Sequence, residues 1–396
     1  MDAAQILRHI DPDALARDTL AFLKVRSETG DEAAASRFFA DLLRREGFEA
    51  IFDEAAPGRP NVYARLPGAA RSPSLLLNGH LDTIPIGNSD PPGRDGDWIV
   101  GRGAEDMKGG LAAMLHAASA IRKAGLRLAG DLWLTAVIGH ETPIGKKEGP
   151  LRLIEHLRSP ADGMPRADAA LIVEGPAAIW AASLGSTIFT VTISSPCGIL
   201  HTIKVPYAEN PARWVGRLLA EFERLEASFD AGPRHALCGR EQLNVGIVRA
   251  GDYPNRLPTP ATVTGTWRWL PGKTHAHVRA ALEALCARLA AESGLDFRAS
   301  FEGHREPFET PAAHPLVHAL ESAGSAVLGK APERIGMALV CDANLYSNDA
   351  AVPTVCYGPA HQTAHSDHER VSLAQLVSCA RIYALTAVHF CGMAEP

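Results

Sequence analysis

Residues 75–87, with the sequence LLLNGHLDTIPIG, contain the pattern on which the fold assignment depends. The apolar stretch Ser74–Asn78 predicts a buried β-strand, and His80 and Asp82 follow directly after it. These two side chains are two residues apart, so on an extended backbone they point to the same side. The pair is consistent with a metal-binding histidine oriented by a carboxylate, or with a core histidine beside a capping aspartate.

Short β-rich stretches alternate with stretches of helical periodicity on both sides of this motif. Strands are expected over residues 62–66, 132–138, 169–173 and 354–357, and helices over residues 14–23, 32–45, 108–124, 314–328 and 372–388. This alternation predicts an α/β fold with a mixed, mostly parallel sheet flanked by helices. In open sheets of this kind, ligands bind at the carboxyl ends of the strands.

The middle of the chain has a different character. Residues 187–195, TIFTVTISS, are rich in β-branched residues, and further strands and two helices follow in an order that suits antiparallel pairing. We therefore expect a discontinuous α/β domain formed by residues 1–186 and 304–396. A compact α+β domain of residues 187–303 interrupts it.

An acidic residue or a histidine follows several of the predicted strands or precedes a predicted helix. These side chains are Glu141, Glu174, the loop histidines His361, His365 and His368, and Asp106 in the glycine-rich stretch GRGAEDMKGG. Any one of them could be a helix cap or surface decoration, but their repetition favours a metal site. Oxygen and nitrogen ligands without thiolate suit Zn²⁺, Mn²⁺ or Co²⁺ in an open hydrolytic site.

Composition and charge exclude several classes of protein. The net charge is −6 and there is no long basic run, which argues against binding to nucleic acid or to an anionic membrane. The sequence shows neither a secretory leader nor the ~20 consecutive apolar residues of a membrane-spanning helix. The seven cysteines are scattered without a C-x-x-C pair, as in reduced, cytoplasmic proteins. We therefore expect a cytoplasmic protein whose partner is a small-molecule substrate.

The motifs together resemble those of the metal-dependent amidohydrolase superfamily of acetylornithine deacetylase, succinyl-diaminopimelate desuccinylase and carboxypeptidase G. The matching stretches are GHLDTIP, GRGAEDMKGG, HETPIG, VEGP, HTIKVPYAENP, NRLP, WRWLPG and GPAHQTAHSDHERV, which occur in the family's order along nearly the whole chain. The resemblance implies a catalytic domain that binds two divalent metal ions. Zn²⁺ is the first choice, Mn²⁺ and Co²⁺ are alternatives, and a single ion is also considered.

The resemblance further implies a role for each matching side chain of the catalytic domain. Five are implied as metal ligands: His80 and Glu174 for one ion, Glu141 and His365 for the other, and Asp106 as the bridge between both. Asp82 is implied to orient His80. His361 is a rival for the position of His365, which fits the motif better.

The inserted domain is implied to act as a lid and to form a homodimer. In it, His201 matches a histidine that reaches an active site, often that of the partner subunit, and helps to polarise the scissile carbonyl. Asn255 and Arg268 match lid residues that touch the substrate.

Position 140 departs from the family pattern, because His140 stands where the general base is normally a glutamate. In one interpretation His140 is itself the base, since imidazole is a competent proton shuttle near neutral pH. In a second, it is a metal ligand or a substrate contact, and the reaction has changed, for instance to hydrolytic deamination of an amine-bearing ring. In a third, catalysis is lost and the chain binds a ligand or a partner.

The leading prediction is a metal-dependent hydrolase that cleaves an amide bond through a metal-activated water. Its substrate would be a small N-acyl amino acid, a dipeptide or a similar conjugate. A deaminase and a non-catalytic binding protein are the alternatives. The loop after Glu141 contains Lys146 and Lys147, which are predicted either to lie in a solvated charged loop or to meet a substrate carboxylate.

Overall fold

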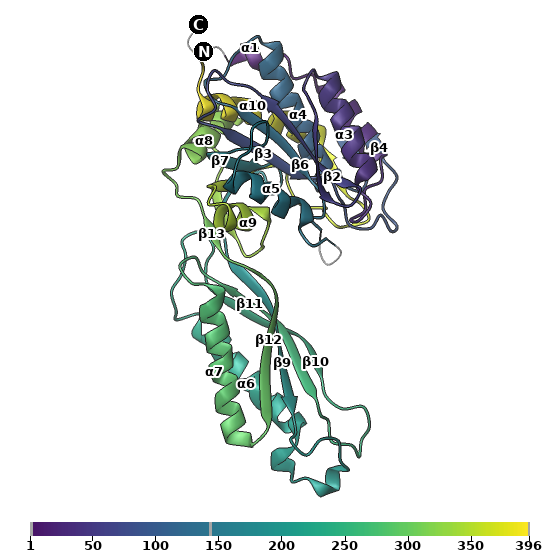
Figure 1. The fold of residues 1–396 in the computed structure, drawn as a ribbon, viewed down its shortest axis with the longest axis vertical. Coiled ribbons are helices and arrows are strands. Elements are labelled where there is room, and N and C mark those ends of the chain that lie inside the picture. Colours follow the sequence, from purple (N-terminus) through teal and green to yellow (C-terminus); the bar gives the residue numbers. More distant parts are fainter. Residues whose placement is uncertain (1–2, 142–144, 395–396) are drawn as a thin grey trace. The chain divides into compact units, whose positions relative to one another are not determined.

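The computed structural model describes residues 3–141 and 145–394, which form two compact units (Figure 1). The first unit contains Met1–Ala181, Thr310–Ile335 and Leu345–Pro396, and the second contains Ala182–Glu309 and Gly336–Asn344. The second unit thus begins at Ala182, and it takes in a short segment, Gly336–Asn344, from the region that the sequence analysis assigned to the catalytic domain.

The described residues form a mixed sheet of nine strands. In spatial order its strands are β1 (Ile51–Ala56), β2 (Arg59–Leu66), β6 (Leu132–Val137), β3 (Leu75–His80), β7 (Ala169–Ile172), β15 (Thr354–Cys356), β8 (Ile179–Ser183) and β13 (Phe308–Glu309), with β14 (Arg334–Met337) paired to β8. The four central strands β6, β3, β7 and β15 are parallel to one another, and the pairs toward both edges are antiparallel. The predicted α/β class with a mixed sheet is confirmed.

The central strands are buried over their whole length, because helices cover the sheet on both faces. Every residue of β3 and β6 is buried, which is typical of parallel strands covered on both sides. The helices that contact the sheet are α3 (Ala33–Arg45), α4 (Lys108–Lys123), α5 (Glu148–Arg158) and α10 (Leu373–Cys391). Two further helices pack on these, α2 (Pro12–Leu23) on α4 and α8 (Pro315–Leu328) on α10. Gly110 of α4 lies against the carbonyl of Val173, where a Cβ atom would clash. The start of α4 therefore lies close to the carboxyl end of β7.

Helix α10 corrects one expectation from the sequence. Its length and mean hydropathy, 1.3 over an 18-residue window, are sufficient for a membrane span, although the sequence analysis found no such stretch. However, 67% of that window is buried inside the structure, where α10 packs on α4 and α8. A helix that is apolar all round is also typical of a protein core, and its position in the core explains its composition.

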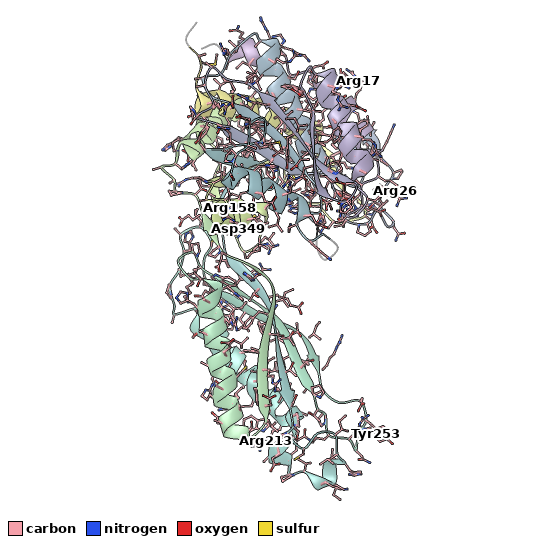
Figure 2. The ribbon with its side chains drawn as sticks, viewed as in Figure 1. Arg17, Arg26, Arg158, Arg213, Tyr253 and Asp349 are labelled. Carbon is pink, nitrogen blue, oxygen red and sulfur yellow. The ribbon has the colours of Figure 1, made fainter. Side chains whose placement is uncertain are left out.

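The second unit is an antiparallel sheet covered by two helices. The sheet has the order β10 (Gln242–Arg249), β11 (Ala261–Trp269), β9 (Gly185–Ser194) and β12 (Asp296–Arg305), and the helices are α6 (Pro211–Ser228) and α7 (His275–Ser293). Burial alternates along β11, which indicates one covered face and one partly open face. Figure 2 shows Tyr253, on the loop between β10 and β11, at the end of this unit where Arg213 also lies.

The remaining described elements are short. They are α1 (Ala4–Leu7), α9 (Asp342–Asp349), the 3-10 helices η1 (Thr202–Lys204) and η2 (Tyr207–Glu209), and a small sheet of β4 (Gly93–Asp95), β5 (Trp98–Val100) and β16 (Arg370–Ser372).

A cluster of charged side chains ties β1 to α5. The carboxylate of Asp53 accepts hydrogen bonds from Arg152 Nη2 at 2.9 Å, His156 Nε2 at 2.8 Å and the Tyr63 hydroxyl at 3.1 Å. Burial raises the pKa of Asp53, but the contacts with Arg152 and His156 outweigh burial, so this pKa lies below its ordinary value. The ionised carboxylate therefore stabilises the fold above the pKa of the unfolded chain. This contribution is lost as the pH falls through the lower pKa of the folded state.

We expect Asp53→Asn to lower the free energy of unfolding by about 1–3 kcal/mol near neutral pH, because Arg152, His156 and Tyr63 lose a charged acceptor. The difference from the unmodified chain should shrink as the pH falls through the lowered pKa of Asp53 in the folded state, where the aspartate itself becomes protonated. Urea unfolding at several pH values measures this difference. Asp162→Asn is the control and should change little, because the Arg71–Asp162 pair is exposed. An equal destabilisation at all pH values would contradict the assignment.

Candidate metal centre

The five side chains predicted as metal ligands lie at one edge of the sheet. His80 ends β3, Glu141 follows β6, Glu174 follows β7, and His365 lies in the loop after β15. Because these four strands are parallel, their carboxyl ends meet at the same edge. Asp106 reaches the same place from the loop before α4.

Asp106 is the centre of the group. Its Oδ1 lies 3.0 Å from His80 Nε2, and its Oδ2 lies 3.2 Å from His365 Nε2. His365 Nε2 is also 3.1 Å from Glu141 Oε1, and His80 Nε2 is 3.7 Å from Glu174 Oε2. The structure therefore brings all five predicted ligands together, with one oxygen of Asp106 facing each side of the group.

The charges of this group suit a bound cation. Asp106, Glu141 and Glu174 are all 7–9% exposed, and buried carboxylates need compensating positive charge. Burial raises the pKa of Asp106, but hydrogen bonds from the neighbouring histidines outweigh burial and hold it well below its ordinary value. Hydrogen bonds to Asp106 and Glu141 raise the pKa of His365 to about 10. Carboxylate and imidazole donors that attract protons this strongly are the donors that a divalent transition metal takes.

His80 is oriented by the backbone of Asp82 rather than by its carboxylate. The Nδ1 of His80 lies 2.9 Å from the Asp82 carbonyl oxygen, whereas the nearest carboxylate oxygen is 3.7 Å away. The carboxylate instead accepts from the backbone N–H groups of His140 at 3.0 Å and Glu141 at 2.8 Å, and from the Thr29 hydroxyl at 2.9 Å. Asp82 therefore fastens the end of β6 to the end of β3.

Two acidic residues that the sequence analysis missed hold the loops of the site in place. The carboxylate of Glu105 accepts from the backbone N–H groups of Gln362 at 2.9 Å and Thr363 at 2.6 Å. That of Glu369 accepts from the backbone N–H groups of Glu105 and Asp106, both at 3.0 Å. Both acids are at most 4% exposed. Glu105 stands beside Asp106 in the sequence, but no local pattern marks either acid as a brace.

His140 lies flat against His80. The two rings are stacked with centroids 4.1 Å apart and an angle of 5° between their planes. The Lys147 ammonium donates to His140 Nδ1 at 3.1 Å, and Lys147 is only 8% exposed. In this part of the predicted charged loop, Lys147 therefore contacts His140 and is not solvated. Residues 142–144 of the same loop lie outside the described residues.

Glu32 and Arg59 also stabilise the turn that contains His140. Gly139 has a φ of 65°, and its N–H donates to Glu32 at 3.2 Å. Arg59 forms ion pairs with Glu32 at 2.6 Å and with Glu148 at 3.2 Å. Through Glu32 and Arg59, the turn after β6 is therefore connected to the start of α5. A side chain at position 139 would meet the Glu148 carboxylate as well as requiring the left-handed backbone.

The three predicted lid residues lie in the second unit. Thr202 N–H donates to the Asn255 carbonyl at 3.0 Å, so the segment after His201 pairs with the segment that contains Asn255. The His201 Nδ1 accepts from the backbone N–H of Ile203 at 3.2 Å. Arg268 lies near the far end of β11 and donates to the carbonyl of Ala338. The structure thus places His201 and Asn255 together and Arg268 apart from them.

Oxygen and nitrogen donors gathered at the carboxyl edge of an α/β sheet suit the open metal site of a hydrolase. Residues 76–389 match the model of peptidase family M20/M25/M40, and the chain belongs to this family. It is accordingly an enzyme, a metal-dependent peptidase or amidohydrolase that acts on C–N bonds. The resemblance drawn from the motifs is confirmed.

Three similar proteins illustrate the range of the likeness. The chain is 28% identical over 386 residues to the N-formyl-4-amino-5-aminomethyl-2-methylpyrimidine deformylase of Bacillus subtilis (strain 168), covering 90% of this chain and 88% of that protein. The aminopeptidase PepT of Bacillus cereus ATCC 10987 has a TM-score of 0.78 at 18% identity, over 96% of this chain and 99% of that one. The Bacillus subtilis protein YXEP, described as a dinuclear metal binding peptidase, has a TM-score of 0.70 at 15% identity, over 95% and 97%.

We expect Glu105→Gln to weaken metal binding by about 10- to 100-fold, because the loop that contains His365 loses its anchor. Titration of the metal-free chain against a chelator of known affinity measures the loss. Asp97→Asn is the matched control, since Asp97 accepts from the Ala374 N–H at the start of α10 and not from the ligand loops. Unchanged affinity in Glu105→Gln would show that the loop holds its position without this brace.

Proposed function

We propose that this enzyme hydrolyses the amide bond of a small N-acyl amine, such as an N-acyl amino acid, a dipeptide or a similar conjugate. The observation that carries the proposal is the position of the Asp106 carboxylate. One of its oxygens faces His80 and the other faces His365, as expected of a carboxylate that bridges two ions. We infer that two divalent ions bind here, with Zn²⁺ as the first choice and Mn²⁺ or Co²⁺ as alternatives.

The proposed residues divide into two groups around Asp106. His80 and Glu174 lie on the Oδ1 side, and Glu141 and His365 lie on the Oδ2 side. When bound, the ions would lower the pKa of a coordinated water and polarise the substrate carbonyl. The protein itself supplies the buried carboxylates and the braces that hold these side chains in position.

We propose a proton-transfer role for His140 in this reaction. Its position directly before Glu141 and its stacking on His80 keep the imidazole beside the ligand group. The Lys147 ammonium can only donate, so a neutral His140 in this arrangement accepts at Nδ1 and has its proton on Nε2. Use of Nε2 as the base would require this contact to change during turnover. Metal ligation is the alternative role, because His80, His140 and Glu174 offer ligand atoms within 4.8 Å of one another.

The name of the similar Bacillus subtilis deformylase guides the choice of test substrates. Its name describes removal of a formyl group from an amine, and the similar solved structures are described as peptidases. A panel should therefore contain N-formyl amines, N-acyl amino acids and dipeptides. The proposed lid roles of His201, Asn255 and Arg268, and the proposed homodimer, stay predictions.

We expect the chain to bind about two equivalents of Zn²⁺ and to release a carboxylic acid and an amine from at least one panel member. Elemental analysis before and after reconstitution measures the metal, and product analysis identifies the bond that is cleaved. Removal of the metal with a chelator should abolish turnover, and added Zn²⁺ should restore it. Release of ammonia from a ring amine would favour the deaminase instead. One equivalent of metal would contradict the dinuclear centre.

We expect His140→Ala to lower kcat by about 10²- to 10⁴-fold with two metal ions still bound, because the proton-transfer group is removed. His140→Glu should retain much more activity than His140→Ala, since a carboxylate can take the same proton. Lys147→Met should cause a smaller loss, because Lys147 only orients the imidazole.

Steady-state kinetics and metal analysis of the same preparations distinguish the roles of His140. Loss of one equivalent of metal in His140→Ala would identify a ligand. Near-normal kcat with both ions bound would rule out proton transfer by His140. Lys146→Met is the control for the loop, because Lys146 is exposed.

A further inference from the structure

A third histidine approaches the bridging carboxylate. His361 Nε2 lies 3.5 Å from Asp106 Oδ2, the same oxygen that His365 Nε2 approaches to 3.2 Å. The sequence analysis treated His361 and His365 as rivals for one position. In the structure both imidazoles lie beside Asp106, and both face its Oδ2 atom.

The backbone on both sides of His361 is fixed by side chains from other elements. Ala360 N–H donates to the side-chain oxygen of Gln375 in α10 at 3.0 Å. On the other side, the N–H groups of Gln362 and Thr363 donate to Glu105, which adjoins Asp106. These contacts fix the backbone of His361, as expected of a residue whose side chain takes part in binding a ligand.

Another histidine of the same loop provides a contrast. The side chain of His368 is 83% exposed and pairs with Asp90, away from the buried carboxylates. That of His361 is 31% exposed. Burial lowers the pKa of His361, but Asp106, and more weakly Glu174 and Glu105, outweigh burial and raise it above its ordinary value. Several carboxylates therefore favour positive charge at the position of this ring.

We propose that His361 is an additional metal-binding side chain, for the ion on the Oδ2 side of Asp106. This inference rests on the proposed dinuclear centre. It gives that ion a donor set of two imidazoles, His361 and His365, and two carboxylates, Asp106 and Glu141. A second imidazole raises the affinity for ions that favour nitrogen donors, such as Zn²⁺ and Co²⁺, more than the affinity for Mn²⁺. The metal preference of this enzyme is thus set partly by His361.

The first experiment measures metal affinity in the full-length chain. The metal-free protein and its His361→Gln variant are titrated with Zn²⁺ and separately with Mn²⁺. We expect His361→Gln to bind one of the two Zn²⁺ ions about 10- to 100-fold more weakly, with a smaller change for Mn²⁺. His368→Gln is the matched control and should bind both metals like the unmodified chain. Circular dichroism of the metal-free proteins shows whether each variant is folded.

The second experiment gives a signal that a purely structural role would not produce. His361→Cys is loaded with Co²⁺, and its near-ultraviolet absorption is recorded. If position 361 contacts the ion, the new thiolate should add a sulfur-to-cobalt charge-transfer band that is absent from the unmodified chain and from His368→Cys.

The outcomes separate the inference from the function on which it rests. Two Zn²⁺ ions bound to His361→Gln with unchanged affinity, or no new band in folded His361→Cys, would overturn the role of His361 and leave the dinuclear centre intact. Failure of the unmodified chain to bind two ions would instead overturn the proposed function.

Discussion

The buried negative charge of Asp106 is the constraint on which the site depends. This carboxylate is 7% exposed, and three histidines, His80, His361 and His365, surround it. Burial alone would raise the pKa of Asp106, yet these neighbours hold it well below its ordinary value, so the folded protein keeps the group ionised. A buried charge of this kind is stable only beside compensating positive charge. The loops that surround Asp106 are arranged to supply it, from protonated imidazole or from metal ions.

Other acidic residues hold these loops by accepting hydrogen bonds from backbone N–H groups. Asp82 holds the N–H groups of residues 140 and 141, Glu369 holds those of residues 105 and 106, and Glu105 holds those of residues 362 and 363. Each acid therefore joins the loop of one strand or helix to the loop of another. A hydrogen bond from a backbone N–H to a buried carboxylate fixes the backbone at that residue. The side chains of the bonded residues and their neighbours therefore have little conformational freedom.

The backbone and the side chain of position 140 have separate contacts. The brace from Asp82 acts on the backbone of His140, so the identity of its side chain does not affect that contact. A histidine at this position stacks on His80 and is met by Lys147. Under the proposed proton-transfer role of His140, a different side chain here would alter that step, while the brace from Asp82 to the backbone would stay in place. The relatives of this chain include a deformylase and peptidases, which agrees with function that is set by local sites on a shared fold.

The sequence by itself determined the α/β class and the residues that meet at the site. Apolar runs such as 75–77 and 132–134 mark buried parallel strands, and parallel strands bring their carboxyl ends, with His80 and Glu141 after them, to one edge. Tertiary structure alone decided the roles of Glu105, Glu369 and Lys147. Glu105 and Glu369 act across more than 250 residues of chain, and acidic or basic residues in loops resemble solvated ones until their partners are known. Periodicity reports which residues are buried, whereas a bond between distant side chain and backbone leaves no pattern in the sequence.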